Sequence, residues 1–371
     1  MQKKPKFAIL GAGGGGQVMA AHLNMLGYEV NLYEHPNFKQ VIDPVIEQGG
    51  IYLTGVLGRH FARLNKVTTN MKEAVEGVDI INIVVPAFGQ MAFFEQLVPV
   101  LEDGQIVIMH PGYLGSIVLA GMLKTIKSKK KVILGESQSL LYNARNKEPA
   151  HAWSFGIKQE LQLAAFPGKH TKELVEAINP VFPQFIPAKD VLETFLNNFC
   201  IVGHPAPTIL NAGRIESTKG KYRVFWDGVT ESVGRFMESI DEERMRIVEE
   251  MGLKRVSCRE WTIRIYSHYG AKGDTLREAL LSSKNLEYGA TPSDLKFTYI
   301  TQDVPYGLIP MISLADKLDI LTPRSKVTVQ MACYLNETDY WAEGRTLERL
   351  GLQGMDKHEL IKFLKEGEQD D

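Results

Sequence analysis

The stretch KFAILGAGGGGQVMAAHLNMLGYEVNLYEHP, residues 6–36, decides the fold of the first half of the chain. A short apolar run (6–10) leads into the turn GAGGGG, a segment with helical spacing of its apolar residues (17–26), and a second apolar run (30–33). Gly27 stands where a glycine commonly ends a helix. This order predicts a strand, a helix and a second strand parallel to the first.

The glycine spacing predicts a dinucleotide site at the turn. Gly11, Gly13 and Gly16 fill the three places of the pattern G-x-G-x-x-G, between a strand and a helix. The first glycine allows a tight turn, the second lets the backbone approach a pyrophosphate, and the third permits close contact of helix and strand. The amides that start the helix, including that of Gly14, would bind the phosphates.

Glu34 ends the second apolar run, 23 residues after Gly11. A carboxylate there accepts hydrogen bonds from the adenosine ribose and repels a 2′-phosphate, so we expect NAD(H) to be preferred. NADP(H) stays open as a second cofactor, because His35 next to Glu34 would offset that repulsion. A glycine turn without any cofactor is the alternative, and FAD would need further motifs that we do not find.

The remaining pattern predicts two domains. Apolar runs at 80–84, 106–109 and 132–134, a helix over 89–101 and extra strands within 150–187 extend the first unit to a doubly wound, mostly parallel Rossmann sheet over residues 1–190. From residue 191 to 371 we expect an all-α domain, with helices over 241–251, 275–282, 308–318 and 325–336. A length of 371 residues suits two domains.

Composition excludes several classes of partner. The 42 basic and 44 acidic residues leave a net charge of -2, so we expect neither nucleic acid nor a membrane surface as partner. No window approaches the ~18 apolar residues of a membrane span. Cys200, Cys258 and Cys333 lack the spacing of a metal site and suit reduced thiols. We therefore expect a cytoplasmic protein without a metal.

His204 lies within NNFCIVGHPAPTILNAGR, residues 197–214. Gly203 before it and Pro205 after it break the local backbone, which can point the imidazole into a cleft at the domain junction. The alternative is that His204 is a purely structural residue, as isolated histidines often are.

Taken in order, these segments resemble the opine dehydrogenase family, of the octopine, nopaline and N-(1-carboxyethyl)norvaline dehydrogenase type. The resemblance runs nearly end to end. Besides the glycine turn and Glu34 it rests on VVPA (84–87), HPG (110–112), GES (135–137), Arg145, Asn198, the run from His204 to Arg214, QDVPYGL (302–308) and EGRTLE (343–348).

The resemblance implies a Rossmann domain followed by a helical domain like the C-terminal one of 6-phosphogluconate dehydrogenase. It implies reductive condensation of an α-keto acid with the amino group of an amino acid or other amine, both small molecules. His204 would be the catalytic acid and base, Asp303 its orienting partner, and Asn198 a third catalytic residue. Pro86 and Ala87 would join the cofactor site, Glu136, Arg145 and Arg214 would be weaker substrate candidates, and a homodimer is one expected assembly.

Two positions depart from the family pattern. Relatives carry an arginine five residues before the aspartate and a glutamate just before it, where this chain has Thr298 and Gln302. An arginine fork suits a substrate carboxylate. The amine and keto acid therefore stay unassigned, with Lys296, Arg214 and Arg324 as replacements.

Other readings remain open at this point. Asp303 is alternatively a helix N-cap, and Asn198 an exposed helix residue. The chain as a whole is alternatively a hydroxy acid dehydrogenase or ketopantoate-reductase-like carbonyl reductase, or a sensor that binds NAD(H) without turnover.

Overall fold

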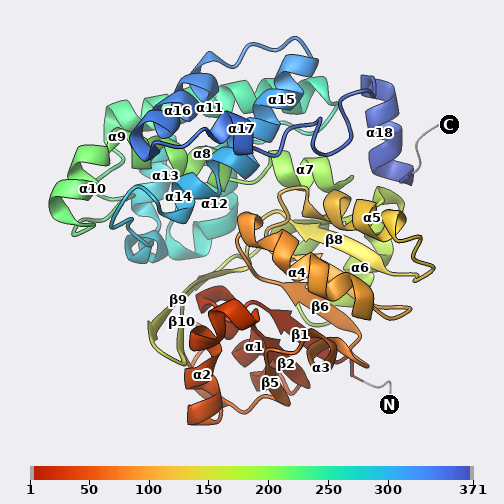
Figure 1. Ribbon diagram of the computed structural model, residues 1–371. Coiled ribbons are helices and arrows are strands. Elements are labelled where there is room, and N and C mark those ends of the chain that lie inside the picture. The colour runs from red at the N-terminus through yellow and green to blue at the C-terminus, as the bar shows by residue number, and fades with distance from the viewer. Residues whose placement is uncertain (1–3, 368–371) are drawn as a thin grey trace. The chain divides into compact units, whose positions relative to one another are not determined.

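The computed structural model describes residues 4–367, which divide into two compact units (Figure 1). The first unit runs to Val191 and includes Lys365–Gly367, and the second comprises Leu192–Leu364. The first unit is α/β, and the described residues of the second form helices without a strand. Over the described range, no helix is both long and apolar enough to cross a membrane.

The main sheet of the first unit has eight strands in the order β12-β11-β8-β7-β6-β1-β2-β5. From β8 to β5 all neighbours are parallel, and β11 joins β8 in the antiparallel sense. The strand order switches sides at β1, with β2 on one side and β6 on the other. Such a switch point is where sheets of this kind bind ligands. The strands are β1 (Phe7–Leu10), β2 (Val30–Tyr33), β5 (Lys66–Thr68), β6 (Ile80–Ile83), β7 (Ile106–Met109), β8 (Ile133–Ser137), β11 (Leu161–Phe166) and β12 (Phe185–Pro187).

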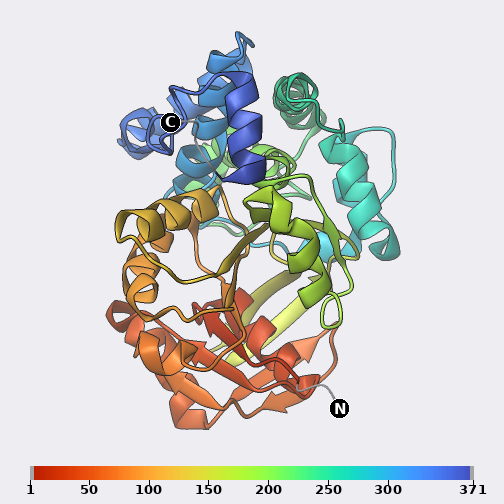
Figure 2. The same cartoon turned by 90° about the vertical axis from the view of Figure 1, so that its right-hand side faces the viewer.

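Helices cover both faces of this sheet (Figure 2), which confirms the doubly wound prediction. On one face α3 (Met71–Val75), α4 (Gln90–Leu97) and α5 (Gly115–Thr125) build an apolar core with Leu10, Ile83 and Met109. On the other face lie α1 (Gly14–Met25) and α6 (Thr171–Ile178). The expected helix over 89–101 ends at Leu97, where a 3-10 turn, Val98–Val100, follows it with Pro99 in its first turn.

A second sheet, in the order β4-β3-β10-β9, was not predicted as such. It packs on α1, and its parallel pair joins β3 to β10 across about a hundred residues, with Leu53 opposite Ala152. Of the four strands of this sheet, only β10 falls within 150–187, where extra strands were expected; β11 and β12 of the main sheet lie there as well. The strands are β3 (Ile51–Gly55), β4 (His60–Ala62), β9 (Tyr142–Glu148) and β10 (His151–Ile157); α2 (Lys39–Gln48) precedes them.

The second unit contains each of the helices expected there. The one predicted over 241–251 begins ten residues earlier, because the Thr230 hydroxyl caps it by accepting the Val233 N–H. A π-helical turn, Val304–Leu308, precedes α15. The helices are α7 (Val191–Leu196), α8 (Cys200–Gly203), α9 (Pro205–Leu210), α10 (Ala212–Thr218), α11 (Glu231–Glu250), α12 (Cys258–Tyr266), α13 (Leu276–Ser282), α14 (Thr298–Thr301), α15 (Ile309–Lys317), α16 (Pro323–Asn336), α17 (Tyr340–Glu343) and α18 (Lys357–Glu366).

Candidate active site

The glycines of the turn have different surroundings, which explain why each position lacks a side chain. Gly11 has φ +106°, and a Cβ there would lie 2.5 Å from the carbonyl oxygen of Val84. A Cβ on Gly16 would lie 1.8 Å from the carbonyl oxygen of Gly11, so α1 could not approach β1 with a side chain there. Nothing lies within 4 Å of a Cβ on Gly13. The fold therefore needs Gly11 and Gly16, whereas the open space at Gly13 fits a ligand.

The start of α1 suits an anion. Gly13 is the N-cap residue and offers no side chain to the first amides of the helix. Those amides carry the positive end of the helix dipole. A Cβ on Gly14 would lie 2.7 Å from the Cα of Arg145, so β9 crosses directly over this end of the helix.

Glu34 lies at the end of β2, beside the turn. The Ala12 N–H donates to Glu34 Oε2 and the His35 N–H donates to Oε1, both at 2.8 Å. Burial raises the pKa of Glu34, and these two amides oppose part of that rise. The carboxylate is therefore a structural support of the turn, in addition to the ribose contact that we predict for it.

Pro86 and Ala87 follow β6 and begin a 3-10 turn, Ala87–Gly89. Pro86 is exposed and Ala87 is buried. Because Gly11 packs against Val84 and Val85, this segment adjoins the glycine turn. The structure thus brings together the cofactor residues that the sequence predicts.

His204 and Asp303 meet in the second unit although they are 99 residues apart. His204 separates α8 from α9, and Asp303 follows α14. The distance from His204 Nδ1 to Asp303 Oδ2 is 2.7 Å, with Asp303 fully buried and the His204 side chain 17% exposed. Asp303 occupies the N-cap position of the Val304–Leu308 turn, as the alternative interpretation expected, but its side chain makes no capping hydrogen bond there.

Electrostatics favour the charged form of His204. Burial lowers its pKa, but interactions with Cys200 and Asp303 outweigh burial and raise the pKa to about 10. Because Asp303 engages Nδ1, Nε2 is the ring nitrogen left to exchange a proton with a substrate. The Gln302 amide donates to the second oxygen of Asp303 at 3.3 Å.

Tyr299 is a site residue that sequence reasoning missed. Its ring stacks on His204 with centroids 3.8 Å apart and an interplanar angle of 16°. Phe199 meets the imidazole edge-on, with centroids 6.4 Å apart. Burial raises the pKa of Tyr299, so the phenol stays protonated. The signal available in the sequence was its position four residues before Asp303, although Asp303 itself lies beyond the end of α14.

His110 shows the contrasting case of a structural histidine. Its Nδ1 lies 2.9 Å from Ser137 Oγ and its Nε2 2.9 Å from Asn82 Oδ1. Burial lowers the pKa of His110 to about 3. A ring that is neutral at pH 7 is a poor proton donor, so His110 holds the ends of three strands together.

Asn198 is 2% exposed, which overturns the interpretation as an exposed helix residue. Its Oδ1 accepts the Cys200 N–H at 3.0 Å, beside the start of α8. Asn198 thus shapes the backbone that carries His204, and its catalytic role remains a prediction.

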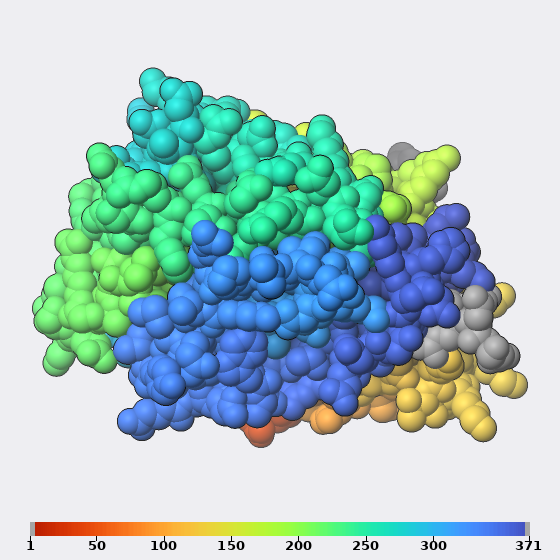
Figure 3. Space-filling view, turned by 90° about the horizontal axis from the view of Figure 1, so that it is seen from above, coloured from red at the N-terminus to blue at the C-terminus, as the bar shows by residue number. Residues whose placement is uncertain are grey.

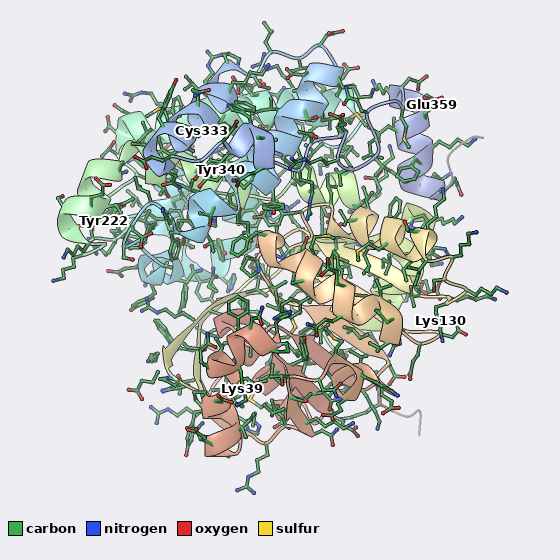
Figure 4. The ribbon with its side chains drawn as sticks, in the orientation of Figure 1. Lys39, Lys130, Tyr222, Cys333, Tyr340 and Glu359 are labelled. Carbon is green, nitrogen blue, oxygen red and sulfur yellow. The ribbon has the colours of Figure 1, made fainter. Side chains whose placement is uncertain are left out.

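The three weaker substrate candidates have structural contacts. Glu136 is buried and accepts the amides of Leu114 and Ser116 at the start of α5. Arg145 lies over the Trp153 ring, with its guanidinium 4.8 Å from the centroid. Arg214 donates to the Asp227 carbonyl at 2.8 Å and covers Tyr222, which Figure 4 labels.

The other positions raised by the sequence are placed as follows. Thr298 begins α14, Lys296 is exposed on the preceding loop, and Arg324 lies 3.8 Å from Glu243 at the start of α16. Between residues 4 and 367 no group of three or more histidine, cysteine or acidic side chains could hold a metal ion.

Comparisons with known proteins agree with this arrangement. A family model described as NAD/NADP octopine/nopaline dehydrogenase, alpha-helical domain, matches residues 187–336. Another, described as the NAD-dependent glycerol-3-phosphate dehydrogenase N-terminus, matches residues 6–133.

Similarity also extends over whole chains. Opine dehydrogenase of Arthrobacter sp. (strain 1C) is 31% identical over 355 residues, covering 96% of this chain and 97% of that protein. The solved structure of octopine dehydrogenase with NADH and agmatine has a TM-score of 0.76 at 17% identity and covers 99% of both chains. Yersinopine dehydrogenase with bound NADP+ has a TM-score of 0.70 at 15% identity, covering 98% of this chain and 99% of that one. The chain belongs to the opine dehydrogenase family.

Proposed function

We propose that the chain joins an α-keto acid to the amino group of an amino acid or other amine, by NAD(P)H-dependent reduction of the imine they form. The observation that carries this proposal is the pair of His204 and Asp303, joined at 2.7 Å and stacked on Tyr299. A protein that only senses a dinucleotide needs no such proton donor.

The glycine turn fits a dinucleotide. The space around Gly13 and the amides at the start of α1 would hold the pyrophosphate, and Glu34 would meet the adenosine ribose. When bound, the cofactor supplies a hydride to the carbon of the C=N bond.

His204 supplies the matching proton. Reduction of C=N to CH–NH consumes one hydride and one proton, and protonated His204 delivers that proton from Nε2 to the substrate nitrogen. Asp303 holds Nδ1 of the ring and stabilises the imidazolium before the transfer. In the oxidative direction the same nitrogen takes the proton back.

The proposal is tested by NADH oxidation against a matrix of keto acids and amines, polyamines included. We expect turnover only when both substrates are present. His204→Ala should lower kcat by roughly 10² to 10⁴ while NADH affinity stays near that of the wild type. Turnover with a carbonyl compound alone would indicate a carbonyl reductase, and tight NADH binding without any turnover would indicate a sensor.

Cofactor preference forms part of the proposal. We expect NADH to bind more tightly than NADPH, because the Glu34 carboxylate repels a 2′-phosphate. Dissociation constants from nicotinamide fluorescence compare the two cofactors, with Glu34→Gln as the variant that removes the charge. Equal or tighter binding of NADPH to the wild type would remove Glu34 from this role.

Location and assembly complete the proposal. Cys200, Cys258 and Cys333 are free thiols, which supports a cytoplasmic location. We also propose assembly as a homodimer.

A further inference from the structure

The second sheet of the first unit packs on α1 with one face only. Side chains along a strand alternate between the two faces of a sheet. Leu53 and Ala152, opposite each other in β3 and β10, are buried on the side of α1. Their neighbours Tyr52, His151 and Trp153 therefore belong to the opposite face, which we call the outer face of this sheet.

Aromatic rings form a row across the outer face. The strand register places Phe61 of β4 opposite Tyr52 of β3, and Tyr52 opposite His151 of β10. The ring centroids of Tyr52 and Phe61 are 4.7 Å apart, and those of Tyr52 and His151 are 6.5 Å apart. Tyr52 is 51% exposed, and Phe61 and His151 are partly exposed. This row can therefore meet a planar ligand group face to face.

Basic side chains flank these rings. The Arg63 guanidinium lies 5.9 Å from the centroid of the Phe61 ring. On the other side of the sheet Arg145 and Lys147 of β9 lie over Trp153, at 4.8 and 4.7 Å from its centroid. All three cations are exposed, and over the described range none of them forms an ion pair with a carboxylate. Their charges are therefore available to an anionic ligand.

The outer face is basic although the whole chain is not. Glu148 is the one acidic residue in the four strands of this sheet, all of which lie within the described range. The net charge of -2 led us to expect no nucleic acid as partner, but that sum describes the chain as a whole. Attraction of a polyanion depends on the local distribution of charge, and here basic side chains predominate.

We propose that the outer face of the second sheet binds single-stranded nucleic acid. Bases stack on Tyr52 and Phe61. Arg63, Arg145 and Lys147 bind the phosphates. In RNA-binding domains, four-stranded sheets with exposed aromatic residues hold two or three bases, and such stacking accepts any base. The site is separate from the glycine turn, because α1, which begins at that turn, packs on the other face of the sheet.

Other occupants account for fewer of these features. An acidic peptide would pair with the cations but leave the row of rings unused. A second copy of the same face would bring like charges together, which repel. A membrane surface attracts basic residues, but here the rings lie along a pleated sheet and not on an amphipathic helix that could insert.

Fluorescence anisotropy of the full chain with labelled oligouridine RNA and oligothymidine DNA tests the proposal. We expect both to bind at low salt. The slope of log K against log salt concentration should be about -2, since each of three phosphate contacts contributes about 0.7. Binding should persist at saturating NADH, which distinguishes this face from the glycine turn. Sedimentation with anionic vesicles tests for a membrane surface.

Variants of the rings and cations locate the site. Tyr52→Ala should weaken binding about five- to a hundredfold, whereas Tyr52→Phe keeps the ring and should bind as the wild type does. Arg63→Gln with Lys147→Gln should reduce the salt slope by about 1.4.

The matched control is Lys129→Gln with Lys130→Gln, which removes two exposed charges from the lysine-rich stretch after α5 in the same unit. Figure 4 labels Lys130, and Figure 3 shows the gold atoms of this part of the chain at the surface. The control should leave binding near that of the wild type. Thermal melts and NADH binding show whether each variant is folded.

Four outcomes would overturn the proposal. They are a wild type that binds neither oligonucleotide, displacement of the oligonucleotide by NADH, binding that the control weakens and the variants of Tyr52, Arg63 and Lys147 do not, and binding to vesicles alone.

Discussion

Replacing Asp303 by asparagine should move the alkaline limit of catalysis. The carboxylate lies 2.7 Å from His204 Nδ1 and is fully buried, so its charge acts on the imidazolium with little screening. Two unit charges about 4 Å apart interact by about 4 kcal/mol at an effective dielectric constant of 20, which equals roughly 3 pKa units. The pKa of His204, raised to about 10 in the wild type, should fall to near 7.

The sign of the effect on rate follows from the direction of the reaction. Reduction needs protonated His204, so wild-type kcat should hold up to about pH 10 and then fall. In Asp303→Asn the fall should begin near pH 7, giving an additional loss of about a hundredfold at pH 9 relative to pH 6. An asparagine can also hold the ring in the wrong tautomer, which would lower kcat at every pH.

The assay is the pH dependence of kcat for NADH oxidation with a productive pair of substrates. Asp294→Asn is the matched control, because it removes the same charge from an exposed position of the second unit. If the alkaline limb of Asp303→Asn coincides with that of the wild type, Asp303 does not set the proton affinity of His204, and the proposed pairing fails.

Three further predictions follow from the contacts described. Gly13→Ala should leave the melting temperature unchanged but weaken NADH binding. Gly16→Ala should impair folding, since its Cβ would lie 1.8 Å from the carbonyl oxygen of Gly11. Normal folding of Gly16→Ala would contradict this expectation. Tyr299→Leu should lower the pKa of His204, because a ring face stabilises a cation by about 0.5–2 kcal/mol, while Tyr299→Phe should keep it; NMR titration of the imidazole distinguishes these outcomes. Glu136→Gln should lower the free energy of unfolding by about 1–3 kcal/mol through its contacts at α5, as measured by urea denaturation, and an unchanged midpoint would refute that assignment.

Local sequence was sufficient to predict elements whose partners lie close to them in the chain. The run from β1 through α1 to β2 was predictable because a glycine turn and two apolar strands lie within 36 residues. The second sheet was not, since β3 has its parallel partner about a hundred residues away. Likewise, nothing in the neighbourhood of His204 indicates Asp303, and the family resemblance supplied that pairing.

Glu136, one of the weaker substrate candidates, shows a structural contact that local sequence does not reveal. A carboxylate just after a buried strand suggests a ligand contact. In the structure, α5 begins after Leu114, whose side chain cannot accept a hydrogen bond from the first amides of the helix. Glu136 from β8 accepts the Ser116 N–H instead and so acts as the cap. A cap supplied by a residue from another element depends on tertiary contact, so the sequence around α5 contains no pattern that would reveal it.

The crossing of β9 over the start of α1 has a consequence for the order in which the protein is made. The glycine turn, complete once residue 16 has left the ribosome, receives its covering strand only after residue 148, and β9 in turn needs β10 as its neighbour. Closing loops of this length is slow compared with forming local helices. We therefore expect the nascent first unit to pass through a stage in which the strands around β1 are assembled before β9 covers the helix terminus for which we propose the cofactor.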